Sequence, residues 1–308
     1  VRAVQVVGRF APSPSGRMHL GNVFSALLAW LSVRAAGGKM VLRIEDLDPD
    51  RCRPEYAAQL REDLLWLGLD WDEEQTPQSQ KSADYAAAFE ALRARGLVYP
   101  CYCSRAQLHA ASAPHAADGQ AVYPGTCRKL TDAQRAAMTK PPAWRLIVPD
   151  EDISFTDGVQ GVYSENLARD CGDFILRRAD GVYAYQLAVV HDDAEAGVTQ
   201  VVRGRDLLGS VPRQMYLQRL LGYPTPEYYH VPLLTAPDGR RLSKRERDLD
   251  LGALRGELTP EALVGRLAYF AGLRPTQEAV TPRQLAAEFS WQRVRRADIS
   301  VGKPQNCL

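Results

Sequence analysis

The chain has 308 residues, of which 45% are hydrophobic and 24% charged, the composition of a globular protein long enough for two domains. A formal net charge of +1 excludes a protein that binds polyanions through bulk charge, and no apolar run is long enough to span a bilayer. Six cysteines are too few for a disulfide framework in a chain of this length, so the expected location is the cytoplasm.

Strands and helices alternate in two separated parts of the chain, which predicts a doubly wound α/β domain with a parallel sheet. Hydrophobic periodicity predicts these elements: strand 4–10, helix 23–34, strand 39–44, helices 54–67 and 83–95, strands 184–191 and 199–203, helix 211–221 and strand 229–234. The expected units are 1–98 (first half of the α/β domain), 99–180 (inserted loop-rich module), 181–250 (second half) and 251–308 (helical C-terminal segment). In the last unit Leu263, Leu267 and Phe270 form a plausible buried stripe.

The segment after the first strand has the features of an anion-binding turn. Pro12 and Pro14 end the strand, because proline cannot donate to a ladder, and Gly16 and Gly21 let the backbone approach a ligand closely. The turn leads into a helix N-terminus, whose free N–H groups and dipole favour a phosphate. His19 lies at that position and would donate to phosphate; the alternative is an ordinary loop histidine.

A basic segment follows the strand at 229–234 and a turn at 237–239. Its cations lie around the small Ser243 and include Arg241, Lys244 and Arg245. A basic loop can close over a polyphosphate and stabilise charge at the reacting phosphorus. The simpler alternative is a solvated charge run.

The inserted module contains a pattern that fits a metal site. Two thiolates from Cys101 and Cys103 and a later pair, Tyr123 and Cys127, would close a tetrahedral zinc site that stabilises a small module. On spacing alone, His109 and His115 compete for the fourth position, and three reduced, partly buried cysteines remain an alternative. The 112–119 segment is an expected mobile loop.

Residues 9–21 resemble the ATP-binding signature of the class I aminoacyl-tRNA synthetases in its glutamyl/glutaminyl form. The sequence His-Leu-Gly-Asn at 19–22 resembles the HIGH tetrapeptide, with Asn22 at its last position, and Arg-Leu-Ser-Lys-Arg at 241–245 resembles the KMSKS loop. The resemblance runs from about residue 8 to 250 and implies a Rossmann-type catalytic domain. It also implies ATP, with Mg²⁺, at His19, Gly21, Ser243 and Lys244, of which His19 and Lys244 would be catalytic.

The resemblance further implies a glutamate site. Its residues would be Arg9, Phe10, Ala11, Pro12, Ser13, Glu45, Tyr185 and Arg203. Because Arg9, Glu45 and Arg203 follow or end predicted strands, all three are expected at one carboxyl edge, with Glu45 for the α-ammonium and an arginine for the side-chain carboxylate. The alternatives are surface ion pairs for the charged residues and a core position for Tyr185.

About sixty residues follow Arg245, where full-length glutamyl-tRNA synthetases continue into anticodon-reading domains, so no anticodon-binding domain is expected. This length and the Cys-x-Cys…Tyr-x-x-x-Cys pattern, a zinc site in that family, favour resemblance to the glutamyl-Q tRNA(Asp) synthetases. The resemblance implies transfer of glutamate to the queuosine base at the wobble position of tRNA(Asp), by a protein without a membrane partner, expected to be a monomer. The alternatives are a short conventional glutamyl-tRNA synthetase and a non-catalytic RNA-binding paralogue.

Overall fold

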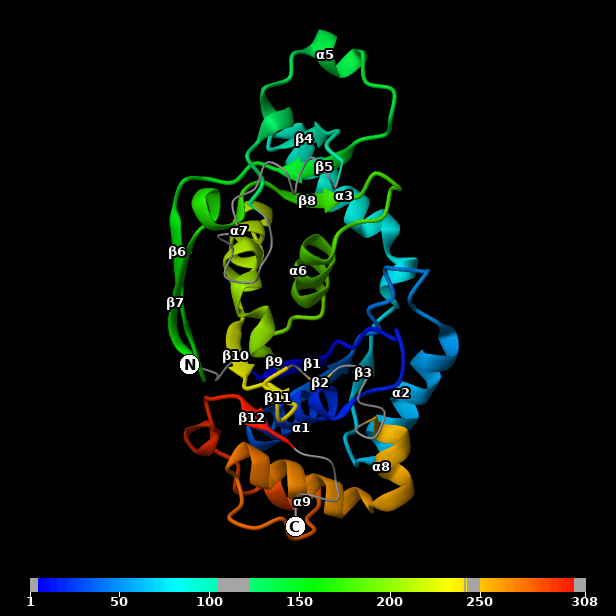
Figure 1. The fold of residues 1–308 in the computed structure, drawn as a ribbon, viewed down its shortest axis with the longest axis vertical. Coiled ribbons are helices and arrows are strands. Elements are labelled where there is room, and N and C mark those ends of the chain that lie inside the picture. The colour runs from blue at the N-terminus through cyan, green and yellow to red at the C-terminus, as the bar shows by residue number, and fades with distance from the viewer. Residues whose placement is uncertain (1–4, 105–121, 241, 243–249, 302–308) are drawn as a thin grey trace.

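The computed structural model describes residues 5–104, 122–240, 242 and 250–301. Two layers of structure stand one above the other, a parallel-stranded part below and an antiparallel module above, with helices between them (Figure 1). The Ser243 and Lys244 positions, His109, His115 and the segment at 112–119 lie outside the described residues.

The lower part is built on short parallel strands. Its elements are β1 (Val7–Phe10), α1 (Leu20–Ala35), β2 (Lys39–Leu42), α2 (Pro54–Trp66), β3 (Glu73–Glu74), α3 (Ser82–Ala94), α6 (Tyr185–Glu195), β9 (Gln200–Gly204), α7 (Val211–Leu221) and β10 (Glu227–Val231). Strand β2 pairs in parallel with β1 and β3, and β10 pairs in parallel with β9. Strand β9 lies beside β1, where the Thr199 N–H donates to the Val7 carbonyl at 2.9 Å. The order β3-β2-β1-β9-β10 is that of a doubly wound sheet, with β1 and β9 on either side of the point where the order reverses.

Helix α1 packs closely against this sheet. A Cβ on Gly8 of β1 would lie 2.3 Å from the Cγ2 of Val33, so only glycine allows the contact. His19 caps the helix, with Asn22 completing the capping box. The cap places the helix N-terminus directly behind the turn that follows β1.

The inserted module has its own antiparallel strands but shares a core with the helices below it. It contains β4 (Val98–Cys101), α5 (Asp132–Ala136), β5 (Ala143–Leu146), the hairpin β6 (Asp152–Asp157) and β7 (Gly161–Asn166), and β8 (Phe174–Arg177). Phe174 and Leu176 of β8 belong to one buried cluster with Phe89 of α3, Leu187 of α6 and Leu217 of α7. The module is therefore packed on the α/β part of the chain; the domain boundaries given in the sequence analysis stay a prediction.

The C-terminal segment is mostly helical and contains α8 (Leu251–Glu257), α9 (Pro260–Ala271) and α10 (Pro282–Ala286). The short strand β12 (Ile299–Ser300) pairs in parallel with β11 (Leu234–Thr235). Leu263, Leu267 and Phe270 are buried in the same cluster as α1, which confirms the predicted stripe on α9.

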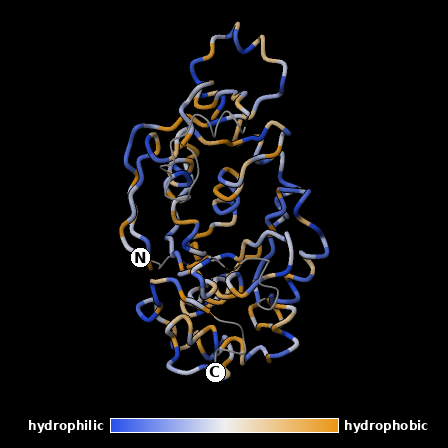
Figure 2. Tube along the Cα trace, in the orientation of Figure 1, coloured by the Kyte–Doolittle hydropathy of each residue, from blue (hydrophilic) through white to orange (hydrophobic). Residues whose placement is uncertain are grey.

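One predicted element is wrong. The segment 184–191, expected as a strand, is the first part of helix α6 (Tyr185–Glu195). Its run Leu187–Val190 is buried on all sides, which removes the helical periodicity that would have identified it. Hydrophobic and hydrophilic residues interleave along the helices (Figure 2), and no described helix is both long and apolar enough to cross a membrane.

Candidate active site

A cavity of about 890 Å³ opens at the carboxyl ends of β1 and β9. It has the size of a pocket for a small-molecule substrate and lies where doubly wound sheets bind ligands. The residues predicted for ATP and glutamate that line it are Arg9, Phe10, Ala11, Pro12, Ser13, His19, Gly21, Glu45, Tyr185 and Arg203. The structure thus brings together, in one cavity, every predicted ATP or glutamate residue that it describes.

The wall formed by the turn after β1 ends at His19. The Gly21 N–H donates to Nδ1 of His19 at 3.2 Å, so Nδ1 is an acceptor and the proton of the neutral ring is on Nε2. His19 is therefore held in the tautomer that can donate a hydrogen bond from Nε2.

Described residues on both sides of Ser243 and Lys244 lie at the cavity. Leu242 is buried and lines the cavity. Asp250 forms a β-bridge with His19, and the Leu251 N–H donates to the Met18 carbonyl at 2.9 Å. The positions of Ser243 and Lys244 are thus flanked by one residue of the cavity lining and by two residues that contact the anion-binding turn.

Two arginines at or near the cavity are paired with carboxylates: Arg9 lines the cavity, and Arg43 lies behind the lining. Arg43 is completely buried and donates to Asp193 at 2.7 Å and to Glu45 at 3.1 Å. Arg9 lies 3.4 Å from the same Asp193 oxygen. Burial raises the pKa of Glu45 above its ordinary value, although Arg43 and Arg9 act to lower it. Burial also acts to raise the pKa of Asp193, but there Arg43 and Arg9 prevail and hold it below its ordinary value.

Arg203 differs from these arginines because its described hydrogen-bond partners are uncharged. Its Nε donates to Nε2 of His230 at 3.0 Å, and its terminal nitrogens donate to Gln214 at 3.0 Å, to Tyr185 at 3.4 Å and to the Leu207 carbonyl at 3.4 Å. Burial and the nearby Arg203 lower the pKa of His230 to about 4, against the effect of Asp157, so the imidazole is neutral at pH 7. Among the described residues, no carboxylate forms an ion pair with Arg203.

Several residues around the cavity were missed in the sequence. Arg43 had a visible signal, a charge inside the apolar strand 39–44. Asp193 and His230 had none, because their partners lie far away in the chain: Asp193 contacts Arg43 across 150 positions, and His230 contacts Asp157 across 73.

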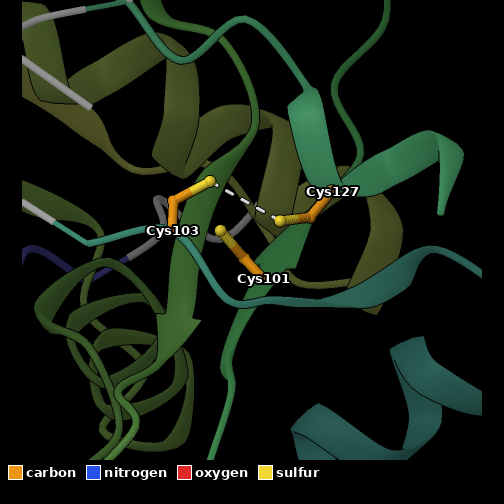
Figure 3. A group of neighbouring side chains, drawn as sticks. All are labelled: Cys101, Cys103 and Cys127. Carbon is orange, nitrogen blue, oxygen red and sulfur yellow. Dashed lines mark hydrogen bonds between the residues drawn. The ribbon is translucent and has the colours of Figure 1, made fainter. Parts of the chain in front are cut away.

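A separate cluster in the inserted module contains the predicted metal ligands. The Sγ atoms of Cys101, Cys103 and Cys127 lie within 4.8 Å of one another and point toward a common centre (Figure 3). The Tyr123 oxygen lies 3.4 Å from Sγ of Cys101 and 3.8 Å from Sγ of Cys103, and the Cys103 and Cys127 sulfurs are 3.5 Å apart. The three cysteines are free thiols.

These distances fit a tetrahedral zinc site. Bonds of about 2.3 Å to sulfur and about 2.0 Å to oxygen at tetrahedral angles separate sulfur from sulfur by about 3.8 Å and sulfur from oxygen by about 3.5 Å. The backbone supports the ligands, since the Tyr102 N–H donates to Sγ of Cys127 at 3.3 Å and the Cys127 N–H donates to the Tyr123 oxygen at 2.9 Å. The three distances given above differ from these values by at most about 0.3 Å, so Cys101, Cys103, Cys127 and Tyr123 fit the ligand set of a tetrahedral zinc ion.

Comparison with known proteins shows the class of protein to which this chain belongs. The family of tRNA synthetases class I (E and Q), catalytic domain, matches residues 5–298. A glutamate tRNA ligase from Elizabethkingia meningosepticum, solved with its amino acid, superposes with a TM-score of 0.82 at 26% identity, over 97% of this chain and 67% of that chain. A putative arginyl-tRNA synthetase from Campylobacter jejuni, with a TM-score of 0.51 at 12% identity, shows the shared fold alone. The catalytic α/β fold of the class I synthetases is thus confirmed.

Relatives with higher sequence identity show which family within this class the chain belongs to. The glutamyl-Q tRNA(Asp) synthetase of Symbiobacterium thermophilum is 50% identical over 96% of this chain and 95% of its own length. That of Nitratidesulfovibrio vulgaris is 51% identical over 87% of each chain. The chain belongs to the glutamyl-Q tRNA(Asp) synthetases.

Proposed function

We propose that this protein activates L-glutamate with ATP and transfers the glutamyl group to the queuosine base at the wobble position of tRNA(Asp). The names of relatives that match nearly the whole chain support this reaction. The observation within the structure that carries the proposal is Arg203, a buried guanidinium in the cavity whose hydrogen-bond partners are neutral. Such a group favours an anionic ligand, because the ligand supplies the missing negative charge.

Glutamate fits the charges of the cavity. Its side-chain carboxylate would bind Arg203 and the nearby Tyr185 hydroxyl, and its α-ammonium would bind Glu45. Burial outweighs Arg43 and Arg9 and raises the pKa of Glu45, so a further positive charge, which a bound ammonium would supply, would stabilise its carboxylate. Arg9 and the turn from Phe10 to Ser13 would close the site around the α-carboxylate.

ATP would occupy the part of the cavity beside helix α1. The phosphates would face the helix N-terminus at Gly21 and the Nε2–H of His19, and Ser243 and Lys244 would bind them as well. ATP enters as its magnesium complex, in which the metal neutralises phosphate charge. The glutamate α-carboxylate then attacks the α-phosphorus and releases pyrophosphate; the enzyme forms no covalent intermediate, and its residues position the substrates and stabilise charge.

A structural zinc ion is the proposed partner of Cys101, Cys103, Tyr123 and Cys127. The support is the tetrahedral spacing of three sulfurs and one phenol oxygen. When bound, zinc would cross-link strand β4 to the segment at 123–127 and so stabilise the tip of the inserted module. We also place the protein in the cytoplasm, where free thiols persist, and expect a monomer.

The test uses labelled glutamate, ATP and tRNA(Asp) with or without queuosine, followed by nuclease mapping of the label. Label in the anticodon fragment of the queuosine-containing tRNA alone supports the proposal. Label at the terminal adenosine of both tRNAs would refute it in favour of a conventional glutamyl-tRNA synthetase. Absence of glutamate-dependent pyrophosphate exchange would refute enzymatic activity altogether.

The role of Arg203 has a test of its own. Arg203→Ala should raise the KM for glutamate about 100-fold in pyrophosphate exchange, because a charge-assisted contact worth about 3 kcal/mol is lost. Arg219→Ala is the matched control, since Arg219 pairs with Glu151 on the surface and should leave the exchange kinetics unchanged. An unchanged KM in Arg203→Ala would contradict the assignment.

A further inference from the structure

A chain of buried hydrogen bonds lies behind Arg203 and leads out of the cavity. The Arg203 Nε donates to Nε2 of His230 at 3.0 Å, and Nδ1 of His230 lies 2.6 Å from Oδ2 of Asp157. The side chains of His230 and Asp157 are both fully buried. Neither residue lines the cavity, so their contact with it is indirect and runs through Arg203.

The donor of each bond is determined by its partners. Nε of arginine carries a hydrogen and has no acceptor capacity, so Nε2 of His230 must be the acceptor. The proton of the neutral imidazole is therefore on Nδ1 and is donated to Asp157. Asp157 also accepts from the backbone N–H groups of Val159, Gln160 and His230, which hold the carboxylate in place.

This arrangement orients the guanidinium of Arg203 without a direct ion pair. His230 accepts from Nε of Arg203. Gln214, Tyr185 and the Leu207 carbonyl accept from its terminal nitrogens, and together these contacts fix the orientation of the guanidinium plane. A carboxylate in the place of His230 would orient the group equally well, but it would form an ion pair and compete with an anionic substrate. A neutral acceptor forms no ion pair with the guanidinium and leaves it able to pair with the substrate.

The same chain connects the glutamate site to the inserted module. Asp157 is the last residue of β6, and the adjoining Gly158 lies against the ring of Tyr229, where a Cβ would meet Cε1 at 2.1 Å. The side chain of Gln160 donates to the His230 carbonyl at 2.9 Å. The end of the β6–β7 hairpin is thus packed onto β10 at the residue that supports Arg203.

We propose that His230, fixed by Asp157, is a positioning residue that sets the affinity of this site for the side-chain carboxylate of glutamate. The inference rests on the proposed role of Arg203 in binding that carboxylate. The end of the β6–β7 hairpin, which contains Asp157 and does not line the cavity, would thereby contribute to substrate specificity.

Two substitutions at His230 separate its two bonds. His230→Asn places an amide near the position of Nδ1, which keeps a donor to Asp157 and removes the acceptor for Arg203. His230→Gln places an amide oxygen near the position of Nε2 and keeps that acceptor. We expect His230→Asn to raise the KM for glutamate about 10- to 100-fold with the KM for ATP unchanged, and His230→Gln to remain within about threefold of the wild type.

Asp157→Asn tests the tautomer with a nearly isosteric change. The Asn oxygen can keep the backbone N–H groups, which turns its NH₂ toward Nδ1 of His230 and makes that nitrogen an acceptor. The imidazole proton then moves to Nε2, where it faces the N–H of Arg203. We expect the KM for glutamate to rise as in His230→Asn, and ¹⁵N NMR of the His230 ring to report the change of tautomer.

The controls distinguish positioning from general damage to the fold. Arg203→Ala gives the full loss of glutamate binding, and His191→Asn removes a histidine that contacts Tyr223 instead. Equal effects of His230→Asn and His230→Gln on the KM values for glutamate and ATP would overturn the proposal, as would a normal KM for glutamate in Asp157→Asn with the altered tautomer. If Arg203→Ala itself leaves this KM unchanged, the role of Arg203 fails, and the present inference fails with it.

Discussion

The buried His230 makes the stability of the fold depend on pH in a defined window. An unfolded histidine has a pKa of about 6.5, whereas the folded structure lowers the pKa of His230 to about 4. Between these values the unfolded chain binds more protons than the folded chain, so acid favours unfolding. The contribution of His230 is complete above pH 6.5 and is lost as the pH falls toward 4.

The magnitude follows from the difference in pKa. The linkage relation gives a loss of about 2.5 kcal/mol at pH 4.5 and about 3 kcal/mol at pH 4, relative to neutral pH. Asp157 adds little in this window, because an unfolded aspartate has a pKa of about 3.9 and so takes up few protons above pH 4; in the fold, His230 and backbone hydrogen bonds outweigh burial and lower the pKa of Asp157 further.

The assay is urea unfolding of the wild type and His230→Gln at a series of pH values between 7 and 4.5. Between pH 7 and 4.5 the free energy of unfolding of the wild type should fall by about 2.5 kcal/mol more than that of the variant. Parallel curves would refute the reasoning, as would a pKa of His230 near 6.5 measured by NMR. Since this test requires no substrate, it examines the neutral histidine independently of the proposed reaction.

Three further predictions concern other parts of the molecule. Lys244→Ala should slow glutamyl-adenylate formation at least 100-fold with little change in glutamate binding, measured by single-turnover kinetics and calorimetry; equal losses in both would contradict its placement on the phosphates. Metal analysis should find one zinc per chain in the wild type and less in Cys103→Ser, and a chelator should lower the melting temperature of the wild type alone; wild-type protein without zinc would remove the site. Gly158→Ala should lower the free energy of unfolding by about 1–3 kcal/mol through its clash with Tyr229, and an unchanged urea midpoint would show that the hairpin can move away.

Local patterns in the sequence were sufficient to predict the strand, turn and helix that form one wall of the cavity. Proline and glycine at 12–21 mark a turn whatever the rest of the chain does, and the strands and helices on either side have regular periodicity. The structure confirms that strand, turn and helix occur there in that order, with His19 at the helix cap. Motifs of this kind depend on neighbours in the chain, and therefore a sequence reveals them.

The helix α6 shows where local signals fail. Its residues Leu187–Val190 are apolar and partly β-branched, which is typical of a buried strand. The segment is helical because it packs between α3, α7 and the sheet of the inserted module, which bury every side of it. The local sequence is compatible with a buried strand and with a buried helix, and only the tertiary contacts select the helix. The strand prediction was wrong because those contacts cannot be read from the sequence.

The partners of the arginines at and near the cavity could not be predicted either, because they are residues distant in the chain. Three arginines near the cavity are equivalent in the sequence, each with its charge inside or at the end of a strand. In the structure Arg9 and Arg43 face Asp193 and Glu45, and Arg203 faces neutral groups. The different roles proposed for the three arginines follow from their different hydrogen-bond partners.

The ion pairs of this cluster give a reason for selecting glutamate over glutamine. Arg9 pairs with Asp193, and Arg43 pairs with Glu45 and Asp193 and lies 3.8 Å from the buried Asp192, whereas Arg203 forms no ion pair with a described carboxylate. The side-chain carboxylate of glutamate would give Arg203 a direct counterion, and the neutral amide of glutamine would not. Breaking such a buried pair costs about 3–5 kcal/mol, so a neutral amide is disfavoured by at least two powers of ten in affinity. A neutral histidine suits the position behind Arg203 for the same reason, because a carboxylate there would compete with the substrate for the guanidinium.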